Sequence, residues 1–231
     1  MLFLTLSLIF LIGILGYILN VVFYSKVSNP RLSMLSLYNS YTQFSYLMLV
    51  YVFVYTFAND FSKGINIFME QIGYSVKKVI SAKVLVLSII IIPLVDVIFL
   101  VMNFVYGNTD FKYLLLLILI VDLGLIFIIS LSIVLSLFLK KTMPATLTLY
   151  GLYIIFNILN LFLYGATNPA DGNSFSTYIL HKLIGVSSGN SYLDKLNVPI
   201  ETWGVFFAIA IPSIWIALLA ILISAKLRKK V

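Results

Sequence analysis

Residues 58–83 read ANDFSKGINIFMEQIGYSVKKVISAK and separate two long apolar stretches. Apolar residues recur in this segment at spacings of three and four, which predicts one stripe of an amphipathic helix. The stripe comprises Ile65, Phe68, Met69, Ile72, Val76, Val79 and Ile80. The opposite face carries Asn66, Glu70, Gln71, Lys77, Lys78 and Lys83. We therefore expect the segment to lie at the membrane surface or to dock on a soluble partner, and not to span. The alternative is a plain connector whose bases stay at the cytoplasmic face.

The composition of the whole chain indicates an integral membrane protein. Hydrophobic residues make up 62% of the 231 residues and charged residues 10%, whereas a soluble domain is about 45–50% apolar. The chain has no cysteine and one histidine. These counts exclude a disulfide framework, an iron–sulfur cluster, a thiol nucleophile and a metal site built from several histidines.

Apolar runs predict an all-α membrane protein in which residues 1–231 form one transmembrane domain. A helix of about 20 apolar residues crosses a hydrocarbon core of about 30 Å. We expect six spans, at about residues 2–23, 37–57, 84–106, 113–139, 145–164 and 203–225. The first run lacks a basic n-region and a small-residue cleavage site, so it is expected to be a permanent span. Residues 165–201 are expected to form an outer loop with a short interfacial helix around Phe175, Tyr178, Ile179 and Leu183, with His181 and Lys182 at its polar edge.

The distribution of basic residues predicts the orientation. The 58–83 segment, the Lys140–Lys141 turn and the C-terminal tail contain ten of the fifteen Lys and Arg residues. These three regions lie on one side of a six-span topology. The positive-inside rule therefore places both termini in the cytoplasm.

Polar residues form aligned faces on two of the predicted spans. The face of the second span consists of Tyr41, Phe44, Met48, Tyr51 and Tyr55. The face of the fifth span consists of Tyr150, Tyr153, Asn157, Asn160 and Tyr164, at steps of three and four. Unpaired amides and hydroxyls are costly against lipid, so these faces are expected to pack against a neighbouring helix or to line a polar path.

Two acidic residues, Asp96 and Asp122, lie within the third and fourth predicted spans, at similar depth from the outer side. A central Asp costs about 2.5–3.5 kcal/mol to insert, so each is expected to face the bundle interior. One interpretation is a site for a proton or for cationic groups of a substrate. The other is structural, with each carboxyl protonated or capped by Ser, Tyr or Asn on a neighbouring helix.

Catalytic motifs are weak in this sequence. No G-x-x-x-x-G-K-[ST] phosphate loop occurs, so ATP-driven work would need another chain. Residues 185–189 fit G-x-S-x-G around Ser187, with His181 nearby. An active serine of this type needs a strained strand-to-helix turn, and this one lies in a loop rich in Gly, Ser and Asn. We therefore expect no catalytic site on this chain.

Residues 58–83 also carry an ordered set of positions. An acidic residue is followed by Gly four positions later, the amphipathic run, a small residue with a nearby base, and Lys just before the next span: Asp60, Gly64, Ser75 with Lys77, and Lys83. This order resembles the first cytoplasmic loop of type-2 ABC transporter permeases. The resemblance implies a coupling helix that sits in a groove of a separate ATPase subunit. The coupling residues it implies are Asp60, Gly64, Phe68, Glu70, Lys77, Lys78 and Lys83.

The predicted arrangement of six spans, cytoplasmic termini and a long outer segment before the last span resembles the same family. The resemblance implies a bacterial plasma-membrane protein, with two ATPase subunits that bind ATP and Mg²⁺ and a second permease, identical or related. No cofactor on this chain and no nucleic acid is expected. The chain is similar to the small Gram-positive permeases that export antimicrobial or toxin peptides, such as phenol-soluble modulin and lantibiotic-immunity exporters.

The expected function is therefore the permease subunit of an ATP-driven exporter of amphipathic peptides, toxins or lipid-like molecules. The path would run along the tyrosine-rich faces of the second and fifth spans, because aromatic rings accept both apolar and polar contacts. A secondary transporter that uses Asp96 and Asp122 as proton or ion sites is the first alternative. An intramembrane hydrolase is a weaker one.

Overall fold

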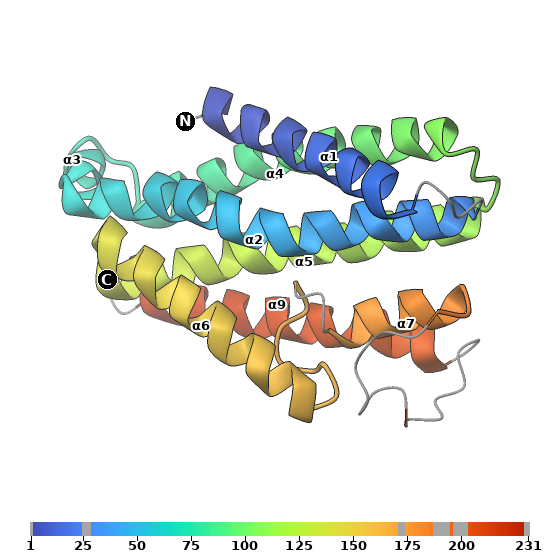
Figure 1. The fold of residues 1–231 in the computed structure, drawn as a ribbon. Helices are drawn as coiled ribbons and strands as arrows, with labels where there is room; N and C mark the ends of the chain where they lie inside the picture. The colour runs from blue at the N-terminus through green and yellow to red at the C-terminus, as the bar shows by residue number, and fades with distance from the viewer. Residues whose placement is uncertain (1, 25–28, 171–173, 187–194, 196–202, 229–231) are drawn as a thin grey trace.

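The computed structural model describes residues 2–24, 29–170, 174–186, 195 and 203–228, and every regular element in these ranges is a helix (Figure 1). In chain order the helices are α1 (Leu2–Tyr24), α2 (Pro30–Ser62), α3 (Ile65–Gln71), α4 (Val76–Val105), α5 (Phe111–Leu139), α6 (Thr142–Phe162), α7 (Phe175–Leu183) and α9 (Val205–Arg228). The predicted all-α class is thus confirmed for the described residues.

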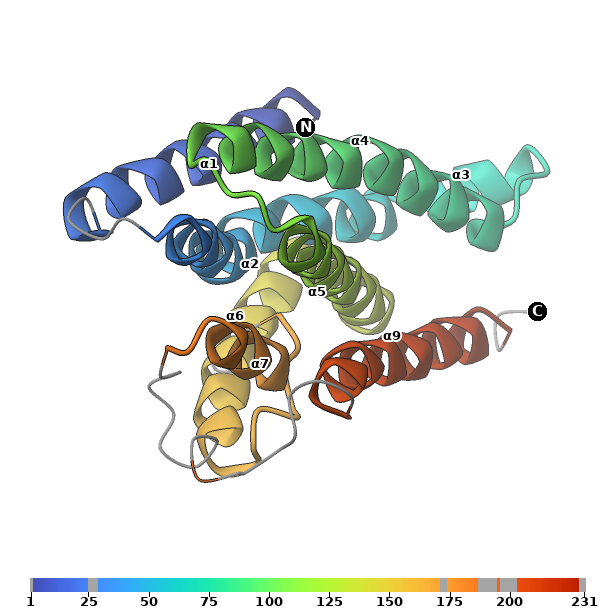
Figure 2. The same cartoon turned by 90° about the vertical axis from the view of Figure 1, so that its right-hand side faces the viewer.

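Helix α5 lies at the centre of the molecule. It contacts α2, α4, α6 and α9, and Figure 2 shows it nearly end-on with α1, α2 and α4 on one side and α6, α7 and α9 on the other. Its sequence is apolar on all sides, as expected for a helix surrounded by others. Two of the serines in its second half, Ser132 and Ser136, are fully buried and donate hydrogen bonds to the carbonyls of Ile128 and Ser132 in their own helix. Their hydroxyls therefore remain satisfied without partners from other helices.

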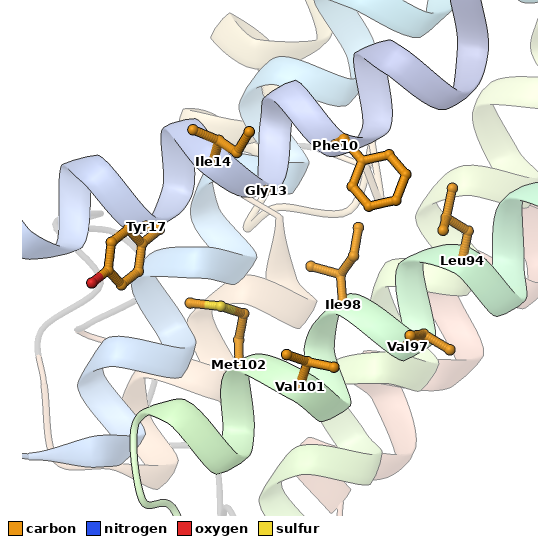
Figure 3. A pocket seen from close by; sticks show the side chains of 9 residues that line it. All are labelled: Phe10, Gly13, Ile14, Tyr17, Leu94, Val97, Ile98, Val101 and Met102. Atoms are coloured by element: carbon orange, nitrogen blue, oxygen red, sulfur yellow. The ribbon is translucent and has the colours of Figure 1, made fainter. Parts of the chain in front are cut away.

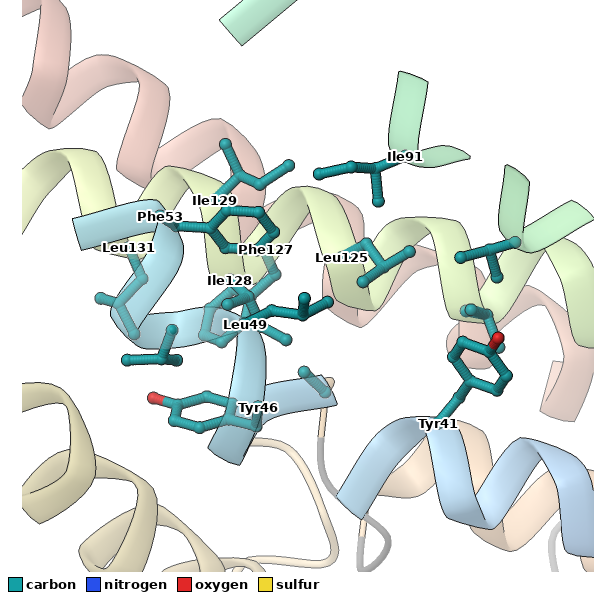
Figure 4. Packing of buried hydrophobic residues seen from close by; sticks show 14 of the residues in the cluster. Tyr41, Tyr46, Leu49, Phe53, Ile91, Leu125, Phe127, Ile128, Ile129 and Leu131 are labelled. Carbon is teal, nitrogen blue, oxygen red and sulfur yellow. The ribbon is translucent and has the colours of Figure 1, made fainter. Parts of the chain in front are cut away.

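The densest packing joins α5 to α2. Tyr46, Leu49 and Phe53 of α2 meet Phe127 and Ile128 of α5 in the same buried cluster (Figure 4). Each of these side chains is at most 1% exposed. Helix α1 packs on the far side of α2, and α4 packs against both α1 and α5.

Within the described part of the chain, five helices are long and apolar enough to cross a membrane: α2, α4, α5, α6 and α9. These five fit a multi-pass membrane protein. Helix α1 is also apolar, over Phe3–Leu19, and a sixth span at this helix stays a prediction. Pro93 and Pro212 both lie inside continuous helices, α4 and α9.

The helices on either side of the 58–83 segment extend further than predicted. Helix α2 starts at Pro30, where the Asn29 side chain caps it, and continues to Ser62. Helix α4 already starts at Val76, where the Ser75 hydroxyl accepts from the Lys78 amide. The prediction of one continuous amphipathic helix over this segment is wrong. Gly64 (φ +68°) and Gly73 (φ +89°) adopt left-handed conformations that break it.

The two ends of the bundle differ in character. The end that contains α3, the α5–α6 turn and the last residues of α9 is called the α3 end below. At the opposite end, the α7 end, Arg31 forms an ion pair of 2.7 Å with Asp110 and so joins the start of α2 to the start of α5. Asn103 and Asn108 bond across the α4–α5 turn at 2.7 Å.

The close approach of α1 to α2 generates a test of this packing. A Cβ added at Gly16 would lie 2.8 Å from Leu37 Cδ1 and 3.2 Å from Ser40 Cβ, whereas nothing lies within 4 Å of one added at Gly151 on α6. Gly16→Val should therefore lower the free energy of unfolding by about 1–3 kcal/mol through overpacking. The change should be visible as a lower melting temperature in detergent.

Gly151→Val is the matched control, expected within about 0.5 kcal/mol of the parent. Equal melting temperatures for the two variants would contradict the α1–α2 contact.

Candidate functional site

The loop between α2 and α4 projects from the α3 end of the bundle (Figure 1). Helix α3 contains no buried residue, and it packs mainly on α2 and α4, the helices that flank it. The segment therefore forms a short exposed projection held at its two ends.

A charged contact closes the base of this projection. Lys83 Nζ on α4 lies 2.5 Å from Asp60 Oδ2 near the end of α2 and donates a second hydrogen bond of 2.8 Å to the Thr56 carbonyl. The two side chains are 30% and 17% exposed. Asp60 and Lys83, two of the predicted coupling residues, thus lie together although 23 residues separate them. The carbonyl of Thr56 was not predicted, since a backbone acceptor leaves no signal in the sequence.

The predicted apolar stripe is divided by the break at Gly73. Val76 and Ile80 are buried against the bundle, each 7% exposed. Ile67, Phe68 and Ile72 are each more than half exposed. Exposed charged residues stand beside them: Glu70, Lys77 and Lys78. The tip of the projection is consequently an apolar patch with charged edges, a composition typical of a surface that binds a protein or a membrane.

A groove of about 330 Å³ continues this surface toward the C-terminal end of α9. Glu70, Ser75 and Lys77 line it on one side, and Ser224 and Arg228 on the other. The contribution of α9 was not predicted, because more than 140 residues separate the two sides in the chain. The charged edge of the projection therefore includes residues from two distant parts of the sequence.

The predicted polar face of α2 divides into a buried part and a more open part. Tyr41 is 1% exposed, donates to the Ile9 carbonyl at 3.1 Å and contacts the Phe99 ring. Tyr41 therefore packs between α2, α1 and α4, and its assignment to a substrate path stays a prediction. Tyr51 is 43% exposed and its ring contacts Tyr55, and Met48 is half-buried. These three residues remain candidates for the path.

The predicted face of α6 is largely occupied by packing. Tyr150 donates to the Leu47 carbonyl at 2.7 Å, and the Tyr153 ring lies 4.5 Å from that of Tyr46 on α2. Asn157 is half-buried on the same helix. Tyr164 does not share this face, since α6 ends at Phe162 and Tyr164 adopts φ +52° in the following turn. Its inclusion in the helical pattern is wrong.

Asn160 is fully buried and organises the loop that follows α6. Its side chain accepts from the amides of Thr167 and Asn168 and donates to the Asn168 carbonyl. The loop then brings Ala170 beside Gly124 of α5, where a Cβ added to the glycine would lie 3.6 Å from Ala170 Cβ. Asn160 thus holds the loop in this structure, and the assignments of Asn160 to the path and of residues 165–170 to an outer loop stay predictions. Irregular backbone is tolerated in a membrane bundle where protein covers it.

Asp96 of α4 and Asp122 of α5 meet between their helices, and their carboxyl groups interact directly. One oxygen of each is buried with no hydrogen-bond partner among the described residues. Two ionised carboxylates in contact would repel, so one shared proton allows one carboxyl to donate to the other. Both residues are half-buried, and no basic residue within the described ranges forms an ion pair with either.

Helix α7 forms where a short helix was predicted, but it is more buried than an interfacial helix. Tyr178 and Ile179 are at most 1% exposed. Thr177 bonds to the Tyr38 hydroxyl of α2 at 2.8 Å, and Ser176 donates to the Ala208 carbonyl of α9 at 2.6 Å. His181 Nδ1 lies 2.8 Å from the Thr177 carbonyl. Ser187 lies outside the described residues.

A further groove, of about 350 Å³, lies between α1 and α4 and is apolar (Figure 3). Phe10 and Ile14 of α1 face Leu94, Ile98 and Met102 of α4 across it. Tyr17 also lines the groove and carries a hydroxyl, and none of the lining residues is charged. The groove suits lipid tails.

Comparison with protein family models, with curated proteins and with solved structures finds no match to this chain. The candidate site therefore rests on the geometry at the α3 end and on the carboxyl pair.

The ion pair at the base of the projection generates a second prediction. Lys83→Met removes both hydrogen bonds, whereas Asp60→Asn removes only the charge pairing and keeps an acceptor for Lys83. Exposed ion pairs contribute about 0–1 kcal/mol and charge-assisted hydrogen bonds about 1.5–3 kcal/mol. Lys83→Met should therefore raise the rate of amide hydrogen exchange at residues 63–75 more than Asp60→Asn does.

Lys141→Met, at an exposed position of the same end, should leave exchange at residues 63–75 unchanged. Identical exchange in the Lys83→Met variant and the parent would show that this contact does not hold the loop.

The carboxyl pair generates a third prediction. Asp96→Asn supplies an amide donor to Asp122, so the melting temperature at neutral pH should stay within a few degrees of the parent. Asp96→Ala leaves the buried Asp122 carboxyl without its partner and should cost about 1–3 kcal/mol. Thermal unfolding in one detergent compares the two. A similar loss in both variants would rule out the shared-proton arrangement.

Proposed function

We propose that this chain is the membrane-spanning permease subunit of an ATP-driven exporter of the type-2 ABC kind, and that the α2–α4 projection is its binding site for a separate ATPase subunit. The single observation that carries the proposal is the exposed α3 held between two membrane-length helices and closed by the Asp60–Lys83 contact. A partner bound at α3 would act on α2 and α4 at once.

The chemistry of the projection supports a protein partner. Phe68 and Ile72 supply apolar contact area, and Glu70, Lys77 and Lys78 supply charges around it. Interfaces commonly combine an apolar centre with a polar rim. In the proposed complex the ATPase binds ATP and Mg²⁺, and this chain holds neither.

Movement would pass from α3 through α2 to the core of the bundle. Helix α2 packs along α5, and α5 in turn contacts α4, α6 and α9. In the proposed exporter, a displaced α2 shifts the side chains on its open face: Met48, Tyr51 and Tyr55. The cargo class is amphipathic peptides, toxins or lipid-like molecules, which aromatic side chains accept on both their apolar and polar sides.

The proposal includes a second permease and two ATPase subunits, in a bacterial plasma membrane with both termini in the cytoplasm. Helix α6 offers an exposed apolar face to lipid or to that second permease, at Leu147, Ile154 and Ile158. Lys140 and Lys141 are exposed at the same end as α3, as the cytoplasmic orientation requires.

A proton- or ion-coupled secondary transporter is the second candidate, favoured by the direct contact of Asp96 with Asp122. Intramembrane acidic residues often mark proton or ion pathways. Under this proposal Asp96→Asn abolishes transport driven by an ion gradient. Under the first proposal it leaves ATP-driven export largely intact.

Affinity purification of the tagged protein from native membranes in mild detergent tests the proposal. A P-loop ATPase should co-purify in stoichiometric amount, and Lys77→Glu combined with Lys78→Glu should reduce its recovery at least about tenfold, since reversal of a rim charge pair costs more than 1.4 kcal/mol. Lys141→Glu is the matched control, an exposed lysine at the same end.

A preparation without any ATPase that transports in proteoliposomes under an ion gradient would overturn the exporter proposal and favour the second candidate. Equal ATPase recovery with the Lys77→Glu/Lys78→Glu variant and with the parent would overturn the assignment of the projection alone.

A further inference from the structure

A groove of about 560 Å³ opens at the α7 end of the bundle, on the side where α5, α7 and α9 approach one another. Arg31, Asp110 and Lys112 lie at its charged part, and Leu116, Leu119 and Val205 are among its apolar walls. This groove therefore joins a polar mouth to apolar walls, in contrast to the groove between α1 and α4, which has no charged lining residue.

The mouth has an excess of positive charge. Asp110 is already paired with Arg31 at 2.7 Å. Lys112 is exposed and forms no ion pair with any residue that the structure describes. Arg31 is 46% exposed and presents further guanidinium N–H groups besides the one on Asp110. An anion at the mouth would find one lysine ammonium and the remaining donors of one arginine.

The walls below the mouth follow the first turns of α5. Lys112 and Leu119 are seven residues apart on this helix, which corresponds to roughly 10 Å along its axis. Leu116 and Leu119 stand on this side of α5, and Val205 at the start of α9 faces them across the groove. This length accommodates the upper part of an acyl chain.

We propose that this groove binds one anionic glycerophospholipid, with the phosphate of its headgroup at Lys112 and Arg31 and one acyl chain along Leu116 and Leu119. The mouth lies at the end of the membrane-length helices α2 and α5, the level at which headgroups stand. Lysine and arginine side chains at headgroup level attract anionic phosphates by charge and by hydrogen bonding. A free phosphate would leave the apolar walls unfilled, so the combined site fits the whole lipid.

The preference for one lipid over another should come from its headgroup and not from its acyl chain. Lipid tails are as apolar as the leucines of the groove, so moving a tail from the bilayer into it provides little hydrophobic gain. The charge at Lys112 distinguishes phosphatidylglycerol from the neutral phosphatidylcholine. One basic residue near the surface changes anionic-lipid binding by about fivefold.

Native mass spectrometry of the detergent-purified protein, titrated with phosphatidylglycerol or phosphatidylcholine, measures this preference. The parent should retain one phosphatidylglycerol in preference to phosphatidylcholine. Lys112→Gln should lower the preference by about fivefold, and Lys112→Arg should keep it. Lys141→Gln, an exposed lysine at the α3 end, is the control and should leave the preference unchanged.

Leu119→Trp tests the acyl-chain part of the site separately, because the larger side chain would fill the groove below the mouth. It should reduce retention of phosphatidylglycerol while the melting temperature stays near that of the parent. Equal retention of the two lipids, or a preference unaffected by Lys112→Gln, would overturn the proposal in favour of ordinary surrounding lipid. Displacement of the lipid by an excess of glycerol phosphate would also overturn it, in favour of a headgroup-only anion site.

Discussion

The contact between α2 and α5 is the interaction on which the rest of the structure depends. Helix α1 packs on α2, α4 and α9 pack on α5, and α6 packs on both. Apolar side chains fill the contact, and the polar side chains near it bond to backbone carbonyls, as Tyr46 does to Leu149 and Ser132 to Ile128. This pattern of packing and bonding follows from the bilayer, in which any unpaired polar group is costly and apolar surface gains little by leaving lipid.

Hydrophobic runs predicted the helices well because length and apolar content are the main requirements of a membrane-spanning helix. The predicted range 113–139 and the observed α5 differ by two residues at one end. The predicted spans stopped short of the C-terminal end of α2 and the N-terminal end of α4. Asn59 is polar but belongs to α2, and Ser75 is polar but caps α4. Hydropathy marks the edge of the apolar region, and the helix continues beyond it until a glycine with positive φ, such as Gly64, stops it.

The candidate site was predictable in its residues but not in its geometry. The acidic and basic residues Asp60 and Lys83 stood out by their positions around the loop, and the structure brings them into contact. The roles of the polar faces on α2 and α6 were harder to predict, because periodicity gives the direction of a side chain on its helix and not what covers it. Tyr41 and Asn160 had the pattern of path residues, yet their hydrogen bonds tie α2 to α1 and fix the loop after α6. The contribution of Arg228 to the groove beside Glu70 depends on tertiary contact alone.

The early start of α4 determines how far α3 stands from the apolar part of that helix. Helix α4 begins at Val76, eight residues before the predicted span starts at Val84, and eight helical residues rise by roughly 12 Å. Val76 and Ile80 on this extension are buried, whereas Phe68 and Ile72 beyond it are more than half exposed. The extension therefore acts as a stalk that is packed on one side and carries an uncovered apolar tip.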